Sequence, residues 1–238
     1  MNANIWNRFS RRAGWRPPTA HLLHIGKTGG TAIKTALEHH ARGAHYTLAV
    51  HPHRFALADV PASEYAVFFL RDPMSRFISG FHSRKRQGAP RYHFPWSPEE
   101  ALAFGRFDTP NDLALSLSSP DPDVRQAARD GMRSIKHVRD GFAHWLGSVE
   151  YLEQRRSGLL FIGFQEHLTE DFDALKRVLG CPDVALPTDE MAAHRAPAGL
   201  DRHLEPQAIE NLSAWYAEDY RILSVCRRIA DGLRRLAG

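Results

Sequence analysis

The 238-residue sequence predicts an α/β fold in which a mostly parallel sheet lies between two layers of helices. Short apolar runs alternate with stretches whose apolar residues recur at helical spacing, an order typical of parallel sheets. The runs are nearly unbroken, as expected of strands covered on both faces. The composition, 43% hydrophobic and 24% charged, favours a single globular domain over residues 1–238 and gives no sign of disorder or of a fibrous fold.

The first half of the chain is expected to supply three strands. Residues 1–19 form a lead-in that ends at Pro17 and Pro18. The predicted strands are 20–25, 46–50 and 65–70, and the last is rich in aromatic and β-branched residues. Helices are expected at 31–40, ended by Gly43, and at 74–86, where Asp72 and Pro73 suit a helix start.

The second half begins with several short helices between residues 97 and 147, separated by prolines and Gly131. We expect residues 88–147 to be a helical insertion that determines substrate specificity. A strand at 158–164 and a helix at 168–179 follow, then a loop at 183–200 and a long helix at 205–236. An apolar stripe marks that last helix: Leu212, Trp215, Tyr216, Tyr220 and Leu223. Core positions are also expected for Trp145, Trp215 and Phe172.

The overall charge and the cysteines set broad limits on partners and compartment. A net charge of +4 and a pI near 9.3 mildly favour anionic partners but are too weak to indicate nucleic acid. Cys181 and Cys226 are isolated, which favours a reducing, cytoplasmic setting. No apolar run approaches the roughly 18 residues of a membrane span, so no stable membrane anchor is expected. The oligomeric state leaves no signal in the sequence.

The stretch LLHIGKTGGTAIKTAL, residues 22–37, is the strongest candidate for a binding site. A strand, a glycine-rich turn and a helix in this order aim backbone N–H groups and a helix N-terminus at an anion. Lys27 adds a positive charge, and Thr28 and Thr31 add hydroxyl donors. A Walker loop places its lysine after the second glycine. Here Lys27 precedes both glycines, so an ATPase or kinase loop fits poorly, and a plain glycine turn with a solvated lysine stays open.

A second candidate is RDPMSRFISGFHS, residues 71–83, directly after the strand at 65–70. Arg71 stands at the end of a buried strand, where parallel sheets present ligand-binding groups. Ser75, Ser79 and Ser83 are spaced by four and therefore share one helix face. Arg71 and Ser79 are predicted to hold a phosphate by charge-assisted hydrogen bonds. The basic residues 84–86 are predicted to be solvated.

KTGGTA after a strand, followed about 40 residues later by FLRDPxxRFxSxF, resembles the paired signature of sulfotransferases. These enzymes use 3′-phosphoadenosine-5′-phosphosulfate (PAPS). The resemblance implies a P-loop-like three-layer fold and assigns the 3′-phosphate to Arg71 and Ser79. It assigns the 5′-phosphosulfate to the first loop, namely Lys27, Thr28, Gly29, Gly30 and Thr31. Two positions depart from the pattern: Gly26 replaces the usual proline, and Ala32 replaces a usual serine or threonine.

His51-Pro52-His53 follows the second predicted strand and should lie near the first loop. Sulfuryl transfer to an alcohol needs a base, and histidine titrates in the right pH range. The HxH pattern resembles that of the uronyl and heparan 2-O-type sulfotransferases, which implies His53 as the base, with His51 as second choice. Lys27 is predicted to stabilise the leaving group. No third ligand has a recognisable spacing, so no metal is expected.

The later segment GFQEHLTEDFDALKRVLG resembles bacterial and carbohydrate-type members of the same family. It implies a soluble enzyme that moves the sulfuryl group directly from PAPS to a hydroxyl acceptor, with a sugar or glycan favoured. His194-Arg195 is a candidate for closing over the nucleotide. Two alternatives stay open: a P-loop kinase-like phosphotransferase, and a nucleotide-binding module without catalysis. The arginines of the last helix are predicted to be solvated: Arg227, Arg228, Arg234 and Arg235.

Overall fold

The computed structural model describes residues 17–38, 45–90, 92–189 and 199–237. Its centre is a parallel sheet in the strand order β2-β1-β3-β4. The strands are β1 (Thr19–Leu22), β2 (Thr47–Val50), β3 (Tyr65–Leu70) and β4 (Leu159–Phe164). In register, Ala20 of β1 pairs with Leu48 of β2 on one side and with Tyr65 of β3 on the other. The predicted α/β fold with a parallel sheet is confirmed.

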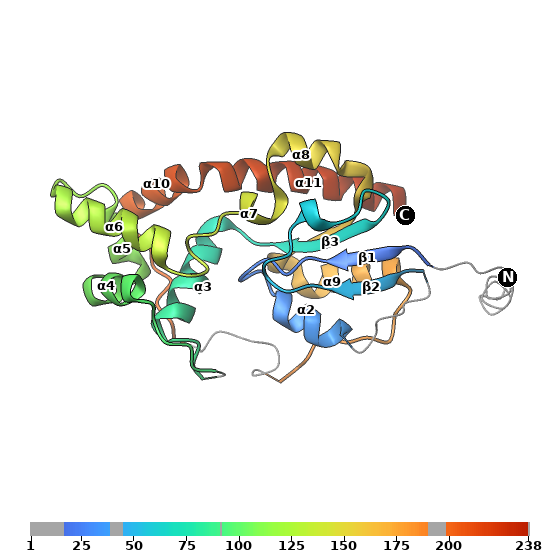
Figure 1. Ribbon diagram of the computed structural model, residues 1–238, viewed down its shortest axis with the longest axis horizontal. Coiled ribbons are helices and arrows are strands. Elements are labelled where there is room, and N and C mark those ends of the chain that lie inside the picture. Colours follow the sequence, from blue (N-terminus) through green and yellow to red (C-terminus); the bar gives the residue numbers. More distant parts are fainter. Residues whose placement is uncertain (1–16, 39–44, 91, 190–198, 238) are drawn as a thin grey trace, which may run out of the picture.

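Helices cover both faces of the sheet (Figure 1). One face carries α2 (Gly30–Leu37) and α9 (Leu168–Leu179), whose buried residues pack against Val67 and Phe69 of β3. The opposite face carries α7 (Ala143–Leu146), α8 (Val149–Gln154) and α11 (Ala217–Ala237), which pack against Phe68 and Leu70. Alternate residues of one strand therefore serve two cores, and this explains why its sequence is apolar without interruption.

The remaining helices form a lobe beside the sheet, at the end where α4, α5 and α6 lie in Figure 1. It consists of α3 (Pro73–Lys85), α4 (Pro98–Arg106), α5 (Pro110–Ser116), α6 (Pro122–Ser134) and α10 (Pro206–Trp215). Its core joins Phe77 and Phe81 of α3 to Phe104, Leu113 and Met132. Proline at the first position and a side-chain cap start α4, α5 and α6. The short helices expected between residues 97 and 147 are confirmed, but the break expected at Gly131 is wrong: Gly131 lies inside α6, where it packs closely against Leu113.

Some element boundaries differ from the predictions. The helix expected at 205–236 is two helices, α10 and α11, which meet at Tyr216. Tyr216 is buried and its hydroxyl donates to the carbonyl of Val138, so the break fixes the long helix to the lobe. The first strand ends at Leu22 rather than at residue 25. The first helix ends at Leu37, with its C-cap at Glu38, rather than at residue 40 as expected. Gly43 and most of the lead-in lie outside the described residues.

Several predictions about individual side chains also have an outcome. Trp145 and Phe172 are buried as expected, whereas Trp215 is only partly buried against the lobe. The four arginines of α11 are exposed as expected, and Arg234 also pairs with the buried Asp171, at 2.7 Å. Within the described ranges, no helix combines the length and apolarity needed to cross a membrane.

Candidate functional site

The loop between β1 and α2 turns sharply at Lys27 and Gly29, whose φ angles are 68° and 85°. A positive φ is ordinary for glycine but strained for lysine. The hydroxyl of Thr28 donates to the carbonyl of Ile25, at 3.0 Å, and closes the turn from inside. No side chain caps the start of α2 at Gly29. The first backbone N–H groups of α2 therefore have no side-chain partner at that cap, as in a helix end that accepts an anion.

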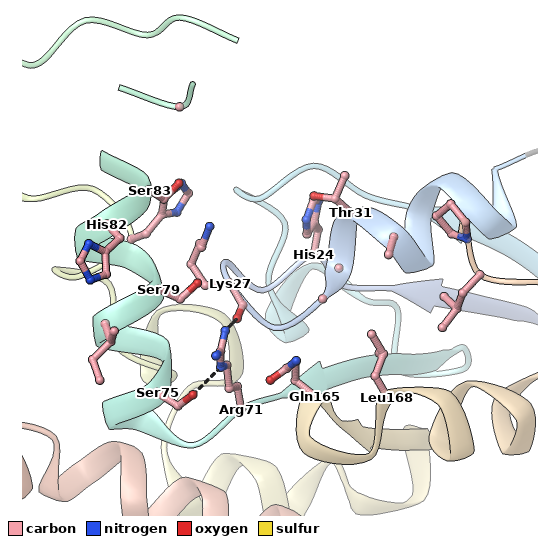
Figure 2. Close-up of a pocket in the computed structure, with 18 of the residues that line it drawn as sticks. His24, Lys27, Thr31, Arg71, Ser75, Ser79, His82, Ser83, Gln165 and Leu168 are labelled. Atoms are coloured by element: carbon pink, nitrogen blue, oxygen red, sulfur yellow. Dashed lines mark hydrogen bonds between the residues drawn. The ribbon is translucent and has the colours of Figure 1, made fainter. Parts of the chain in front are cut away.

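This loop borders a large cavity of about 1380 Å³ at the carboxyl ends of the strands. The cavity brings together the two predicted motifs, with Lys27 and Thr31 from the first and Arg71 and Ser79 from the second. Gly29 and Gly30 also line it. Figure 2 shows Lys27 and Ser79 facing each other across the space between the loop and α3, with Arg71 beneath them.

Thr28 is the exception among the predicted loop residues. Its side chain is 1% exposed, points inward to Ile25 and does not line the cavity. The expectation that its hydroxyl serves as a ligand donor is corrected: Thr28 shapes the turn. Thr31, one helical turn further on, is the threonine that reaches the cavity.

Arg71 links the two motifs directly. Its Nε donates to Ser75 Oγ at 2.9 Å, and its Nη1 donates to the carbonyl of Lys27 at 3.4 Å (Figure 2). These bonds use two of the five guanidinium donors, and the other donors form no further bond within the described part of the chain. Asp72 caps α3 by accepting from the backbone N–H of Ser75, so the start of the helix is fixed next to Arg71.

Ser75, Ser79 and Ser83 all line the cavity, as their spacing of four predicts. Ser75 is occupied by Arg71. Ser79, one turn further along α3, extends the polar stripe toward Lys27 (Figure 2).

The buried side chain of Arg76 binds the backbone of the loop at Gly26. It is 1% exposed, donates from Nε to the carbonyl of Gly26 at 2.9 Å and from Nη2 to the carbonyl of Asp140 at 2.6 Å. Its guanidinium lies 5.3 Å from the ring centroids of both Phe142 and Trp145. A fully buried charge held by two backbone carbonyls fixes Gly26, and with it the position of the neighbouring Lys27.

The electrostatic environment of Lys27 is unusual. Burial, and then the positive charges of Arg71, Arg86 and Arg76, lower its pKa to about 8. With a pKa of about 8, Lys27 is still largely protonated at neutral pH. Its positive charge is unfavourable in the free protein, and a bound anion would stabilise it. The cavity is therefore prepared for a negatively charged ligand.

His53 lies at the side of this cavity with a defined tautomer. Its Nδ1 is 2.9 Å from the carbonyl of His24, and since a carbonyl only accepts, Nδ1 carries the proton. In the neutral ring Nε2 is then the basic nitrogen. Trp145 Nε1 donates to the carbonyl of His53 at 2.6 Å and fixes the backbone. His53 is exposed at the surface, and partial desolvation lowers its pKa against the hydrogen bond to His24, which raises it; the charges of Lys136 and Lys27 act in the same direction as the desolvation.

The structure separates His51 from His53. His51 stacks on Phe55, with ring centroids 3.5 Å apart, and its Nε2 lies 2.8 Å from Nδ1 of His21. His21 in turn reaches Glu64 at 2.6 Å. His51 does not line the cavity. Of the two histidines of the predicted pair, only His53 lines the cavity, so the structure favours it over His51 as the candidate base.

The prediction that residues 84–86 are solvated is wrong for this run. Arg84 is 2% exposed and forms a two-pronged ion pair with the buried Glu100, at 2.8 and 2.6 Å. Lys85 pairs with Asp108 at 2.8 Å. Arg86 lines the cavity. Glu100 lies opposite Arg84 because α3 and α4 pack together. The local sequence around residue 84 contains no pattern that predicts this contact.

Two further histidines belong to the site and were not predicted. The ring of His24 lies 3.8 Å from that of His53 and packs over Gly30, where an added Cβ would come within 2.4 Å of it. The ring centroid of His137 lies 5.9 Å from that of His53, and His137 also lines the cavity. His24 is the last residue but one of the first predicted strand, so its place beside the loop could have been anticipated. His137 follows α6, and nothing in the sequence links it to the loop.

No protein-family model matches the chain, and neither the curated proteins nor the solved structures include a match to it. Among the described residues, no three or more His, Cys, Asp or Glu side chains are arranged to hold a metal ion. His194-Arg195, the predicted closing element, lies outside those residues. The interpretation of the cavity thus depends on its own residues and on the motif resemblance.

Proposed function

We propose that the protein is a PAPS-dependent sulfotransferase that transfers the sulfuryl group to a hydroxyl acceptor. One observation carries the proposal: both halves of the motif pair line a single cavity, and His53 stands beside them with Nδ1 bonded to a backbone carbonyl. Either motif alone is compatible with a simple structural role. Their convergence at the carboxyl ends of β1 and β3 is what a ligand phosphorylated at both ends requires.

In the proposed complex the 5′-phosphosulfate lies on the loop and at the N-terminus of α2, held by Lys27, Thr31 and backbone N–H groups. The 3′-phosphate lies on Arg71 and Ser79, at the start of α3. Arg71 contacts the carbonyl of Lys27, so the two phosphate sites are mechanically coupled. Two observations support this arrangement: the donor groups of both motifs line one cavity, and the two motifs follow each other in the order typical of sulfotransferases.

The chemical step follows from the same residues. The acceptor oxygen attacks sulfur in line with the bridging oxygen, and Nε2 of His53 takes the hydroxyl proton. The new O–S bond forms as the bond from sulfur to the bridging oxygen breaks, and adenosine 3′,5′-bisphosphate leaves. Lys27 stabilises the negative charge that develops on that oxygen. We favour a sugar or glycan hydroxyl as acceptor, from the carbohydrate-type resemblance.

The nucleotide preference tests this proposal. Adenosine 3′,5′-bisphosphate should raise the melting temperature, and adenosine 5′-monophosphate, which lacks the 3′-phosphate, should bind far more weakly. Arg71→Ala should weaken binding of the bisphosphate by about 3 kcal/mol, on the order of two charged hydrogen bonds. Arg106→Ala is the matched control, because Arg106 is exposed on α4 and does not line the cavity.

Two results would redirect the assignment. Stabilisation by ATP with magnesium but not by adenosine 3′,5′-bisphosphate would refute the sulfotransferase and favour a phosphotransferase. Binding of the bisphosphate without transfer of ³⁵S-sulfate from PAPS to any member of a broad hydroxyl panel would indicate a nucleotide-binding module without catalysis.

A further inference from the structure

Three titratable side chains that do not line the cavity are joined by hydrogen bonds. His21, on β1, is buried, and its Nε2 lies 2.6 Å from Oε2 of Glu64, the residue before β3. Nδ1 of the same ring lies 2.8 Å from Nε2 of His51, the residue after β2. We call Glu64, His21 and His51 the histidine chain. It links three neighbouring strands, and no step of the proposed reaction uses it.

The bonds determine where the protons of the histidine chain lie. A carboxylate only accepts, so Nε2 of His21 carries a proton and Nδ1 of its neutral ring is an acceptor. Nε2 of His51 then donates to that Nδ1, which leaves Nδ1 of the neutral His51 ring without a proton. One further proton fits at Nδ1 of His51 without changing either bond. A second would place N–H groups on both nitrogens of the 2.8 Å contact, and two donors do not form a hydrogen bond.

The surroundings of His51 also oppose a second positive charge. The residue is half-buried, and its ring stacks on Phe55 with the ring centroids 3.5 Å apart. Burial, and then the charge of His21, lower the pKa of His51. Two imidazolium groups held this close together repel each other, so the contact tolerates one added proton but not two.

Two carboxylates from other elements act on the pair of rings. The hydrogen bond from His21 lowers the pKa of Glu64, so this carboxylate stays ionised in mild acid and balances one added proton. The charge of Asp59, in the short helix Leu57–Asp59, raises the pKa of His51 but has a smaller effect than burial and His21. Asp59 accepts from the backbone N–H of Ala56 at 2.8 Å and forms no bond to His51. Neither carboxylate therefore separates the two rings.

The histidine chain fastens the turn that carries His53 to β1. The backbone N–H of His51 donates to the carbonyl of Leu22 at 3.1 Å, beside the contact between the two rings. His53 itself is bonded to the carbonyl of His24 through Nδ1–H, a donor in both the neutral and the charged ring. Protonation of His53 leaves that bond in place. The contact between His21 and His51 is the one that added protons break.

We propose that the histidine chain is a proton-sensitive contact that releases the turn at residues 51–55 from β1 in mild acid. With the contact intact the two rings take up one proton, and with the contact open they take up two. Below the ordinary histidine pKa of about 6.5 the open form thus binds one proton more. Linkage then favours opening about tenfold for each unit by which the pH falls, and above pH 6.5 the contact is fully stable. Its effect on activity rests on the proposed function, because the released turn carries His53, the proposed base.

Hydrogen exchange of single backbone amides, followed by NMR between pH 7.5 and pH 5, tests the opening. Protection of the amide of residue 51 should fall at least tenfold between pH 6.5 and pH 5. The reference is the amide of Leu23, which donates to the carbonyl of Val67 inside the sheet and should lose less than threefold. His51→Gln keeps a donor for His21 but takes up no second proton, so the extra loss at residue 51 should disappear. His203→Gln, an exposed histidine outside the histidine chain, should behave as the wild-type protein.

Ring ¹⁵N signals of histidine-labelled protein report the proton positions independently. At pH 8 both His21 and His51 should carry their proton on Nε2, and the first added proton should appear on Nδ1 of His51. An Nδ1–H tautomer of His51 at pH 8 would overturn the inference. So would two fully protonated rings with residue 51 still protected, or an equal loss of protection at residue 51 in His51→Gln. Failure to bind adenosine 3′,5′-bisphosphate would instead refute the proposed function and leave these readings unaffected.

Discussion

Raising the pH above 8 should weaken nucleotide binding, because Lys27 then loses its charge. Its pKa in the free protein is about 8. A bound phosphate favours the protonated form and should return this pKa toward the ordinary value of about 10.4. Linkage then gives an affinity about tenfold lower at pH 9 than at pH 7. The phosphates change little over this range, because their second pKa is about 6.

Calorimetric titration with adenosine 3′,5′-bisphosphate from pH 7 to pH 9, at constant ionic strength, measures this dependence. Buffers of different ionisation enthalpy would also report the proton taken up on binding near pH 9. The control is Lys27→Met, which should bind more weakly at pH 7 and show no decline between pH 7 and pH 9. A flat wild-type profile, or an equal decline in Lys27→Met, would refute the role given to Lys27.

Two further substitutions separate chemistry from stability. His53→Ala should leave the affinity for adenosine 3′,5′-bisphosphate nearly unchanged and lower turnover of PAPS roughly 100-fold or more. The control is His51→Ala, which lies outside the cavity and should change turnover much less. Full activity of His53→Ala at neutral pH would contradict the assignment of the base. Arg84→Met should lower the free energy of unfolding in urea by about 3–5 kcal/mol, because Glu100 is left buried and unpaired. Adding Glu100→Gln should recover part of that loss, and a single-variant loss below about 1 kcal/mol would show that the pair contributes little.

The regular elements could be predicted because their signals are local. The strand at 65–70 and the helix at 168–179 have the bounds that their apolar patterns indicate. Each pattern reflects the burial of one element against its neighbours and requires no knowledge of which neighbours these are. The turn was recognisable for the same reason: the backbone at Gly29 has a positive φ, and glycine is the residue that adopts it most readily.

The roles of similar residues in one short stretch could not be predicted. Arg84 and Arg86 are two positions apart, yet one pairs with Glu100 in the lobe and the other faces the cavity. His51 and His53 differ in the same way. Residues two apart on a helix, such as Arg84 and Arg86, point to different sides of it. At His51 and His53 the chain leaves β2 and turns at residues 53–54. What each side chain meets depends on elements far away in the sequence. Charge and residue type alone do not contain that information.

The site combines a rigid frame with an unfavourable concentration of charge. Lys27 holds a positive φ, and burial together with the neighbouring guanidinium groups depresses its pKa, so the free protein is strained there both in backbone and in electrostatics. Arg76 holds the loop in this conformation, because it is buried and donates hydrogen bonds to the backbone carbonyls of Gly26 and Asp140. The donors therefore need little rearrangement when an anion binds, and its charge relieves the repulsion that the frame maintains.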